Sequence, residues 1–401
     1  MIEASKLYGK SSLHIGESVY PCFIKVDLLA GTIHIHGNFK DVLDNRECTF
    51  EYLNSKRIFI SEIEIENNYF PITGELEKLF ISQISRKGLN LYTDSILARL
   101  FHINPNYNYD SFKVVPFSSK IEFNILSDKK IDSFEIWFKT SKENSTLIGQ
   151  LNVFNKKFVL SSDKEYLVVR SHRLLTESEI NKIRVGLSFV FGSETHVLYY
   201  VNGEKLIINL KTHIINNGLT PLNSLEGKLN ALKCFLEHTI HFTEQQFERY
   251  ENSLFLYLSG KTAPIYMNSR LSLFFICIES LFDGDQETPL EHKILKLFNL
   301  KNPKSYDQNK TTISFSFDKA LSRALAKVRN VIMHQGVIAE NIYEEYKSEN
   351  SMTCIIDKCN NDCIDLWLYM CYLLDIYFLN NISYKGEYYN VSDKKIMNTK
   401  T

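Results

Sequence analysis

Hydrophobic and polar positions alternate with a period of two along much of the first half of the chain, as expected of β-strands. Isoleucines at positions 33 and 35 alternate with His34 and His36, and β-branched residues dominate positions 58–65. Similar runs cover residues 120–126, 133–140 and 183–192. Many short strands separated by turn signals favour a sandwich-like β region.

The clearest turn in this half is the pair Asn202 and Gly203, which has strand patterns at 196–201 and 204–210 on either side. Asn-Gly favours the positive φ values of a type I′ turn, whose twist matches that of two paired strands. We therefore predict a β-hairpin here. A more helical interval near residues 85–110 leaves open a division of the β-rich region, residues 1–215, into two subdomains.

In the second half of the chain, hydrophobic residues recur at the spacing of an α-helix. Gly, Pro, Asn and Ser gather at residues 216–228, as in a linker. Thr243, with Gln246 three residues later, resembles a capping box at the start of a helix. Apolar positions then recur at helical spacing along 265–282, 317–334 and 352–379, and Pro289 opens a shorter helical piece. The apolar face of the 317–334 segment comprises Leu321, Ala324, Leu325, Val328 and Ile332.

These patterns predict an α+β multidomain protein. A β-rich, sandwich-like N-terminal region is followed by an all-α helical bundle over residues 229–385, and the polar tail over 386–401 is expected to fray. The chain of 401 residues is long enough for two or three such domains.

Charge and cysteine content restrict the classes of function. The net charge of −1 excludes a protein-wide basic field for gripping nucleic acid, so any such surface must be a local patch. The chain begins without an apolar leader, has no stretch long enough to span a bilayer, and scatters its eight cysteines. We therefore expect a cytoplasmic protein with reduced thiols and no membrane partner.

One pair of side chains, Arg329 and His334, carries candidate chemistry at the end of a predicted helix. A histidine can take a proton from a 2′-hydroxyl, and the donor fork of an arginine stabilises charge that develops on a phosphate. RNA supplies its own nucleophile, so this chemistry needs neither a metal nor a cofactor. Five residues of an ideal helix turn the two side chains about 140° apart, so a second copy of the helix in a dimer would complete such a site.

The spacing alone also fits a surface arginine beside a helix-terminal histidine that makes a local hydrogen bond, because chance supplies on the order of one such pair. The context is more specific. Polar Asn330 follows the arginine, the next positions are apolar, and an upstream apolar helix is interrupted by the single carboxylate of Glu279. This arrangement, over about residues 229–381, resembles the HEPN superfamily, whose signature is an arginine, a polar residue, a few further residues and a histidine.

The HEPN resemblance implies a metal-independent endoribonuclease that forms a homodimer or a higher homo-oligomer. Arg329 and His334 would be catalytic and Asn330 accessory, while Glu279 would either orient Arg329 or form only a structural salt bridge with it. Four basic residues would form a phosphate-facing patch, or else only a solvated helix face: Lys293, Lys296, Arg323 and Lys327.

The whole architecture, a β-rich half before this domain, resembles ApeA-type anti-phage proteins. That resemblance implies an abortive-infection effector that cleaves RNA, such as host tRNA, when the β-rich region senses a phage-derived trigger. Two other functions stay open. One is a non-catalytic HEPN-like binding module whose β-rich region recognises a protein or glycan, which a buried, backbone-bonded His334 would favour. The other is the toxin of a toxin–antitoxin pair.

Several motifs match other kinds of site only in part. Lys10 and Lys261 each stand between a glycine and a hydroxyl residue, as in a phosphate-binding loop, but the earlier glycine is missing. Buried thiols are favoured over zinc for Cys354, Cys359 and Cys363. A solvent-facing strand face is favoured over a metal site for His34 and His36. An acidic turn is favoured over a calcium loop for Asp283, Asp285 and Glu287.

Overall fold

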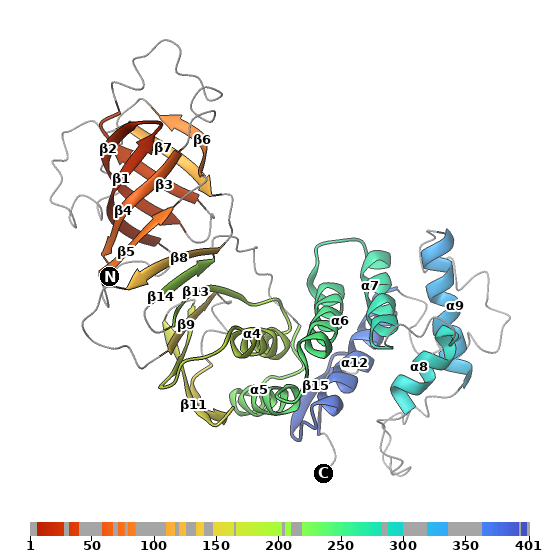
Figure 1. Ribbon diagram of the computed structural model, residues 1–401. Coiled ribbons are helices and arrows are strands. Elements are labelled where there is room, and N and C mark those ends of the chain that lie inside the picture. Colours follow the sequence, from red (N-terminus) through yellow and green to blue (C-terminus); the bar gives the residue numbers. More distant parts are fainter. Residues whose placement is uncertain are drawn as a thin grey trace. The chain divides into compact units, whose positions relative to one another are not determined.

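The chain forms two compact units in a computed structural model (Figure 1). Residues described are 6–27, 32–39, 58–66, 71–76, 79–85, 110–116, 120–125, 134–139, 147–163, 166–202, 205–209, 219–282, 288–299, 319–335, 363–392 and 394–398. The β unit comprises Met1–Thr146, Lys156–Leu175 and His196–Ile214. The helical unit comprises Leu147–Asn155, Thr176–Thr195 and Ile215–Thr401.

The β unit is built from strands whose described pairings are all antiparallel. Its strands are β1 (Lys6–Ile15), β2 (Ser18–Asp27), β3 (Thr32–Gly37), β4 (Ile58–Glu66), β5 (Pro71–Leu76), β6 (Leu79–Ser85), β7 (Asp110–Pro116), β8 (Lys120–Ile125), β9 (Phe134–Lys139), β11 (Lys156–Asp163), β12 (Tyr166–Ser171), β13 (His196–Asn202) and β14 (Lys205–Asn209). The strand order is β11-β12-β9-β13-β14-β8-β5-β4-β1-β2-β3-β7-β6. Sandwich-like packing of this sheet stays a prediction.

Alternating burial is clear in β2, where Cys22, Ile24 and Val26 are buried and the residues between them are half-buried. In β3, Ile33 and Ile35 are fully buried, and Ile35 pairs with the fully buried Ile24 of β2. The predicted hairpin is confirmed, since β13 and β14 pair up to the register Asn202↔Lys205. The strands predicted at 58–65, 120–126 and 133–140 are confirmed as β4, β8 and β9. The predicted helical interval near 85–110 lies almost wholly outside the described residues.

The strand predicted at 183–192 is wrong, because this segment belongs to a helix, α4 (Glu177–Phe191). Thr176 and Glu179 form a capping box at its start, and Gly192 ends it with φ 67° in the left-handed region. From Val185 to Phe191 every residue is buried. The hydrophobic pattern of a short, mostly apolar segment does not distinguish a buried strand from a buried helix. The capping box was therefore the informative signal.

The helical unit contains α4, α5 (Leu225–Thr239), α6 (Glu244–Thr262), α7 (Met267–Ser280), α8 (Leu290–Asn299), α9 (Lys319–Gln335) and α12 (Cys363–Asn381). It also contains β10 (Gly149–Val153) and a hairpin of β15 (Glu387–Asn390) and β16 (Lys395–Asn398). The capping box of Thr243 and Gln246 is confirmed at the start of α6. The apolar face predicted for α9 is confirmed as buried. No described helix is long and apolar enough to cross a bilayer.

Both ends predicted for the helical domain need correction. The predicted linker, 216–228, overlaps the first turn of α5, which begins at Leu225 after the N-cap Ser224. The predicted frayed tail, 386–401, contains the β15–β16 hairpin, whose Tyr388 is buried. The backbone N–H of Tyr389 donates to the carbonyl of Pro221 at 2.6 Å, so the tail is held against the segment that precedes α5.

Candidate active site

Arg329 lies on α9, which packs against α7 and α8. Its neighbour Val328 is buried, so Arg329 itself stands at the edge of the buried face with 23% of its side chain exposed. Glu279 likewise lies at the edge of the buried face of α7, next to the buried Ile278. The two charged groups meet across the helix pair, where Arg329 Nη2 lies 2.9 Å from Glu279 Oε1. The structure therefore brings together the two residues whose pairing the HEPN resemblance implies.

A second contact uses another nitrogen of the same guanidinium. Arg329 Nη1 donates to Oδ1 of Asn330 at 3.2 Å. A guanidinium has five N–H donors in a planar fork. Glu279 and Asn330 therefore occupy both terminal nitrogens of Arg329 while leaving further donors on them open to another acceptor.

His334 is exposed in the last turn of α9. The helix continues to Gln335, so its end does not unwind before the histidine. The two candidate catalytic side chains therefore point about 140° apart and are separated by a rise of about 7.5 Å along the axis. His334 is therefore not the buried histidine that would have favoured a binding module.

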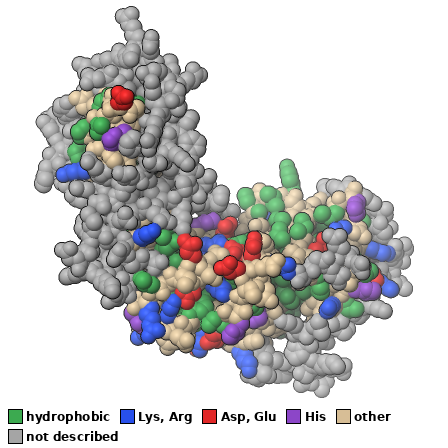
Figure 2. Space-filling view, in the orientation of Figure 1, with side chains coloured by type: hydrophobic (Ala, Val, Ile, Leu, Met, Phe, Trp, Pro, Cys, Tyr) green, Lys and Arg blue, Asp and Glu red, His purple; other side chains and the backbone are tan. Residues whose placement is uncertain are grey.

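One of the four residues expected to form a phosphate-facing patch is withdrawn from solvent, while Arg323 and Lys327 lie one turn apart on α9. Lys293 is buried, so that member of the predicted patch is wrong: its position on α8 falls beside the buried Ile294. Lys296 lies 5.9 Å from the Phe282 ring centroid. Arg323 Nε lies 3.7 Å from Glu291 Oε2, and Lys327 is half-buried on α9. On the face drawn in Figure 2, basic and acidic side chains of the described residues are interspersed.

The described residues of the partial phosphate-loop and metal-site motifs lie in regular strands and helices. Lys10 lies inside strand β1, and Lys261 is buried in the last turn of α6, so neither belongs to a phosphate-binding loop. His36 is buried, contrary to the solvent-facing strand expected, and its ring stacks 6.4 Å from that of His34. No metal-binding cluster occurs among the described residues. The residues Cys354, Cys359, Asp283, Asp285 and Glu287 lie outside the described ranges.

A buried polar cluster went unpredicted. Lys261 Nζ lies 2.8 Å from Asp375 Oδ1 and donates to the Tyr257 hydroxyl at 2.8 Å, and that hydroxyl donates to Asp375. Both charged side chains are 0% exposed, and Asp375 Oδ2 has no hydrogen-bond partner among the described residues. Burial raises the pKa of Asp375 although Lys261 opposes that rise, and burial raises the pKa of Tyr257 as well. The sign of this cluster in the sequence was the carboxylate of Asp375, which stands among apolar residues in the second half of α12.

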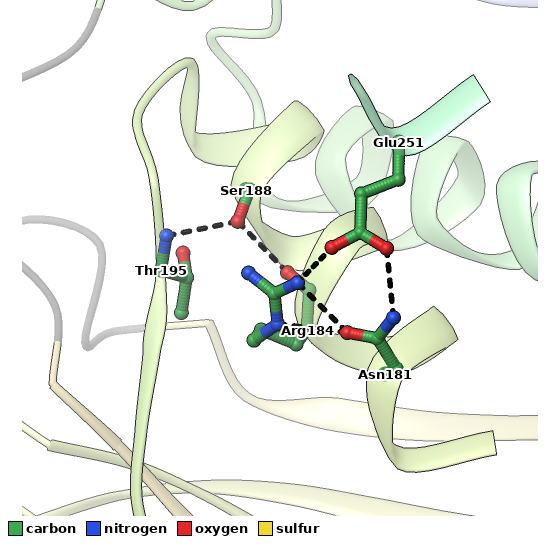
Figure 3. Close-up of polar contacts among 5 residues, drawn as sticks. All are labelled: Asn181, Arg184, Ser188, Thr195 and Glu251. Atoms are coloured by element: carbon green, nitrogen blue, oxygen red, sulfur yellow. Dashed lines mark hydrogen bonds and ion pairs between the residues drawn. The ribbon is translucent and has the colours of Figure 1, made fainter. Parts of the chain in front are cut away.

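A second polar cluster fixes α4 to α6 (Figure 3). Arg184 forms an ion pair with Glu251, and it donates to Asn181 Oδ1 from Nη2 at 2.7 Å. Asn181 Nδ2 in turn donates to Glu251 Oε2 at 2.8 Å. The Arg184 guanidinium also lies 5.0 Å from the Phe255 ring centroid. Every polar group of this cluster comes from α4 or α6, so its role is to hold these two helices together.

The chemistry available at the α7–α9 face is that of a cation and a separate imidazole. Arg329 can donate to an anionic oxygen, and the exposed His334 can exchange a proton with solvent or a ligand. Neither residue is placed to act on the other within one chain. Comparisons of this chain with protein-family models, curated proteins and solved structures found no match.

Proposed function

We propose that the protein is a HEPN-type, metal-independent endoribonuclease. One observation carries the proposal: Arg329 is held at the α7–α9 face by Glu279, 2.9 Å away, while His334 stands exposed on the same helix. This arrangement agrees with the roles that the HEPN resemblance assigns to Arg329 and His334. It leaves both groups accessible to an RNA phosphodiester.

In the proposed reaction, His334 takes the proton of a ribose 2′-hydroxyl, and the 2′-oxygen attacks the adjacent phosphorus. The bond from phosphorus to the 5′-oxygen breaks, and that oxygen receives a proton. Arg329 stabilises the charge on the non-bridging oxygens as the transition state forms. Glu279 and Asn330 set the direction of the guanidinium.

A second copy of the chain completes this site, because Arg329 and His334 diverge on one regular helix. Two exposed apolar side chains flank the ion pair. Ile276 lies one turn before Glu279 on α7, and Met333 lies one turn after Arg329 on α9. Covering these side chains would give a second copy an apolar anchor beside the charged groups, so we propose a homodimer or higher homo-oligomer.

The biological setting is a proposal that rests on the resemblance to ApeA-type proteins. The β unit holds none of the candidate catalytic residues, so we assign it the sensing of a phage-derived trigger. The helical unit then cleaves RNA, such as host tRNA, in the cytoplasm and aborts the infection. The competing proposal is a non-catalytic binding module, and the internal neutralisation of Arg329 by Glu279 is the observation that favours it.

Cleavage of total RNA by purified wild type and by His334→Ala, with EDTA present throughout, tests the proposal. Loss of a general base lowers the cleavage rate by about 10²–10⁴-fold. Matching circular dichroism and melting curves establish that the variant is folded, which is expected because His334 is exposed. Equal cleavage by the two proteins would remove His334 from the mechanism. If neither protein cleaves, a latent enzyme that awaits its trigger and a binding module both stay open, and the ligand of the β unit is then the next target.

A further inference from the structure

Glu279 is itself an anion bound to the guanidinium that an RNA phosphate would bind. Its carboxylate lies 2.9 Å from Arg329, closer than any other charged group that the structure records for this arginine. The Asn330 side chain occupies the other terminal nitrogen at 3.2 Å. The guanidinium is therefore already matched with a carboxylate of the same charge as a phosphodiester.

We propose that Glu279 competes with RNA phosphate for Arg329 and thereby sets the affinity of the site for RNA. This inference rests on the proposed ribonuclease function and concerns the regulation of that same site. Glu279 is a positioning residue in this scheme, because it acts on RNA only through Arg329. Its carboxylate holds the arginine in place when the site is empty and opposes the incoming anion when the site fills.

Exposure makes this exchange physically accessible. The Glu279 side chain is 35% exposed, so it can swing into solvent without leaving a buried charge behind. Partly exposed ion pairs of this kind contribute little to stability and are readily broken. The contrast is Lys261 and Asp375, both 0% exposed, whose carboxylate has no route to water. Unlike that buried pair, the Arg329 pair can exchange its carboxylate for a phosphate.

Glutamine at position 279 separates positioning from competition. Glu279→Gln keeps an oxygen that can accept from Arg329 but removes the negative charge. Competition by charge therefore predicts tighter RNA binding by this variant, whereas a role in positioning alone predicts no gain. Glu237→Gln is the matched control, since Glu237 lies 3.7 Å from Lys233 in an exposed pair on α5 and its substitution removes the same charge.

The test is the affinity for a single-stranded 2′-O-methyl RNA oligonucleotide, which lacks the nucleophilic hydroxyl and cannot be cut. Glu279→Gln is expected to bind about two- to fivefold more tightly than wild type, the range for releasing one exposed ion pair. Its salt dependence should steepen by about 0.7 in the slope of log K against log salt, as one more phosphate is neutralised. Glu237→Gln should match wild type.

The gain must depend on Arg329. In an Arg329→Met background, Glu279→Gln should bind no better than Arg329→Met alone. A gain that persists there, equal gains in Glu237→Gln, or no binding by any variant would overturn the inference. Unmodified RNA separates this result from the proposed function. RNA that is bound more tightly by Glu279→Gln but not cleaved would contradict the ribonuclease and support the competition. RNA that is cleaved but not bound more tightly by Glu279→Gln would support the ribonuclease and contradict the competition.

Discussion

Two cations of the helical unit are each paired with a carboxylate, and burial gives the pairs different consequences. Arg329 and Glu279 are partly exposed, so their pairing is worth little and can be exchanged for another partner. Lys261 and Asp375 are fully buried, so either charge would be left uncompensated without the other. The exposed pair therefore belongs to the candidate site and the buried pair to the stability of α6 against α12.

Removal of the buried cation should be severe. Lys261→Met leaves Asp375 buried without its counter-charge and should lower the free energy of unfolding by about 3–5 kcal/mol, measured by urea denaturation. The double variant Lys261→Met/Asp375→Leu removes both charges and should recover much of that loss. A single variant as stable as wild type would show that the ion pair is dispensable.

The deficit of Lys261→Met should also depend on pH. Burial raises the pKa of Asp375 in the folded protein, so the folded state binds this proton more tightly than the unfolded chain does. That contribution is present below the unfolded pKa of about 3.9 and is lost as pH rises toward the folded value. Without Lys261 the rise in pKa is unopposed by a counter-charge, so the deficit relative to wild type should be larger at pH 8 than at pH 5. Equal deficits at both pH values would contradict the assignment.

Among the elements, those with a clear period and a cap could be predicted from the sequence. The α6 start at Thr243 and the buried face of α9 are such cases. The segment at 183–192 could not be assigned from its period because most of its residues are apolar. The contact of Arg329 with Glu279 was expected from the HEPN resemblance. Lys293 was misplaced because one position on a short helix separates a buried side chain from an exposed one.

The end of α4 offers a test at this scale. A Cβ on Gly192 would lie 2.5 Å from the backbone oxygen of Leu219, at a positive φ of 67°. Gly192→Ala should therefore lower the free energy of unfolding by more than the strain of the left-handed region alone, which is about 1–3 kcal/mol. The loss is read from the melting temperature of the unit that holds the substituted glycine. Gly16→Ala is the matched control, since Gly16 has φ 62° with nothing within 4 Å of the added Cβ. Equal effects of the two substitutions would show that the Leu219 contact relaxes freely.

For the whole molecule, the division into units does not follow the order of the chain. The segments Leu147–Asn155 and Thr176–Thr195 come from the first half but belong to the helical unit. The Phe189 ring of α4 stacks on that of Phe235, with ring centroids 6.1 Å apart, and packs at a tilt against that of Phe378, with centroids 6.2 Å apart. The contiguous helical domain predicted at 229–385 is therefore incomplete, because it lacks the α4 part of its own core.

Residues 216–401 expressed alone should consequently fail to form a cooperatively folded domain. Loss of α4 exposes the aromatic surface that Phe189 covers, so the fragment should bind the dye ANS and lack a near-ultraviolet circular dichroism signal. The full chain is the control. A fragment that unfolds in one sharp transition would show that α4 is an accessory to the helical core.

Sharing of the site between two copies can be tested by complementation. Arg329→Ala and His334→Ala should each be inactive, but a mixture allowed to exchange subunits regains one intact site in each mixed dimer. Random exchange then restores about a quarter of wild-type activity in a two-fold dimer. Activity that stays at the level of the separate variants would place both residues of the site in one chain.

The central claim is that Arg329 and His334 cleave RNA by attack of its own 2′-hydroxyl. The chemical ends of the RNA fragments test this most directly, determined after incubation with wild type or His334→Ala in EDTA. We expect 2′,3′-cyclic phosphate and 5′-hydroxyl ends with wild type and no such ends with His334→Ala. Fragments that carry 3′-hydroxyl and 5′-phosphate ends, or cleavage that EDTA abolishes, would contradict it.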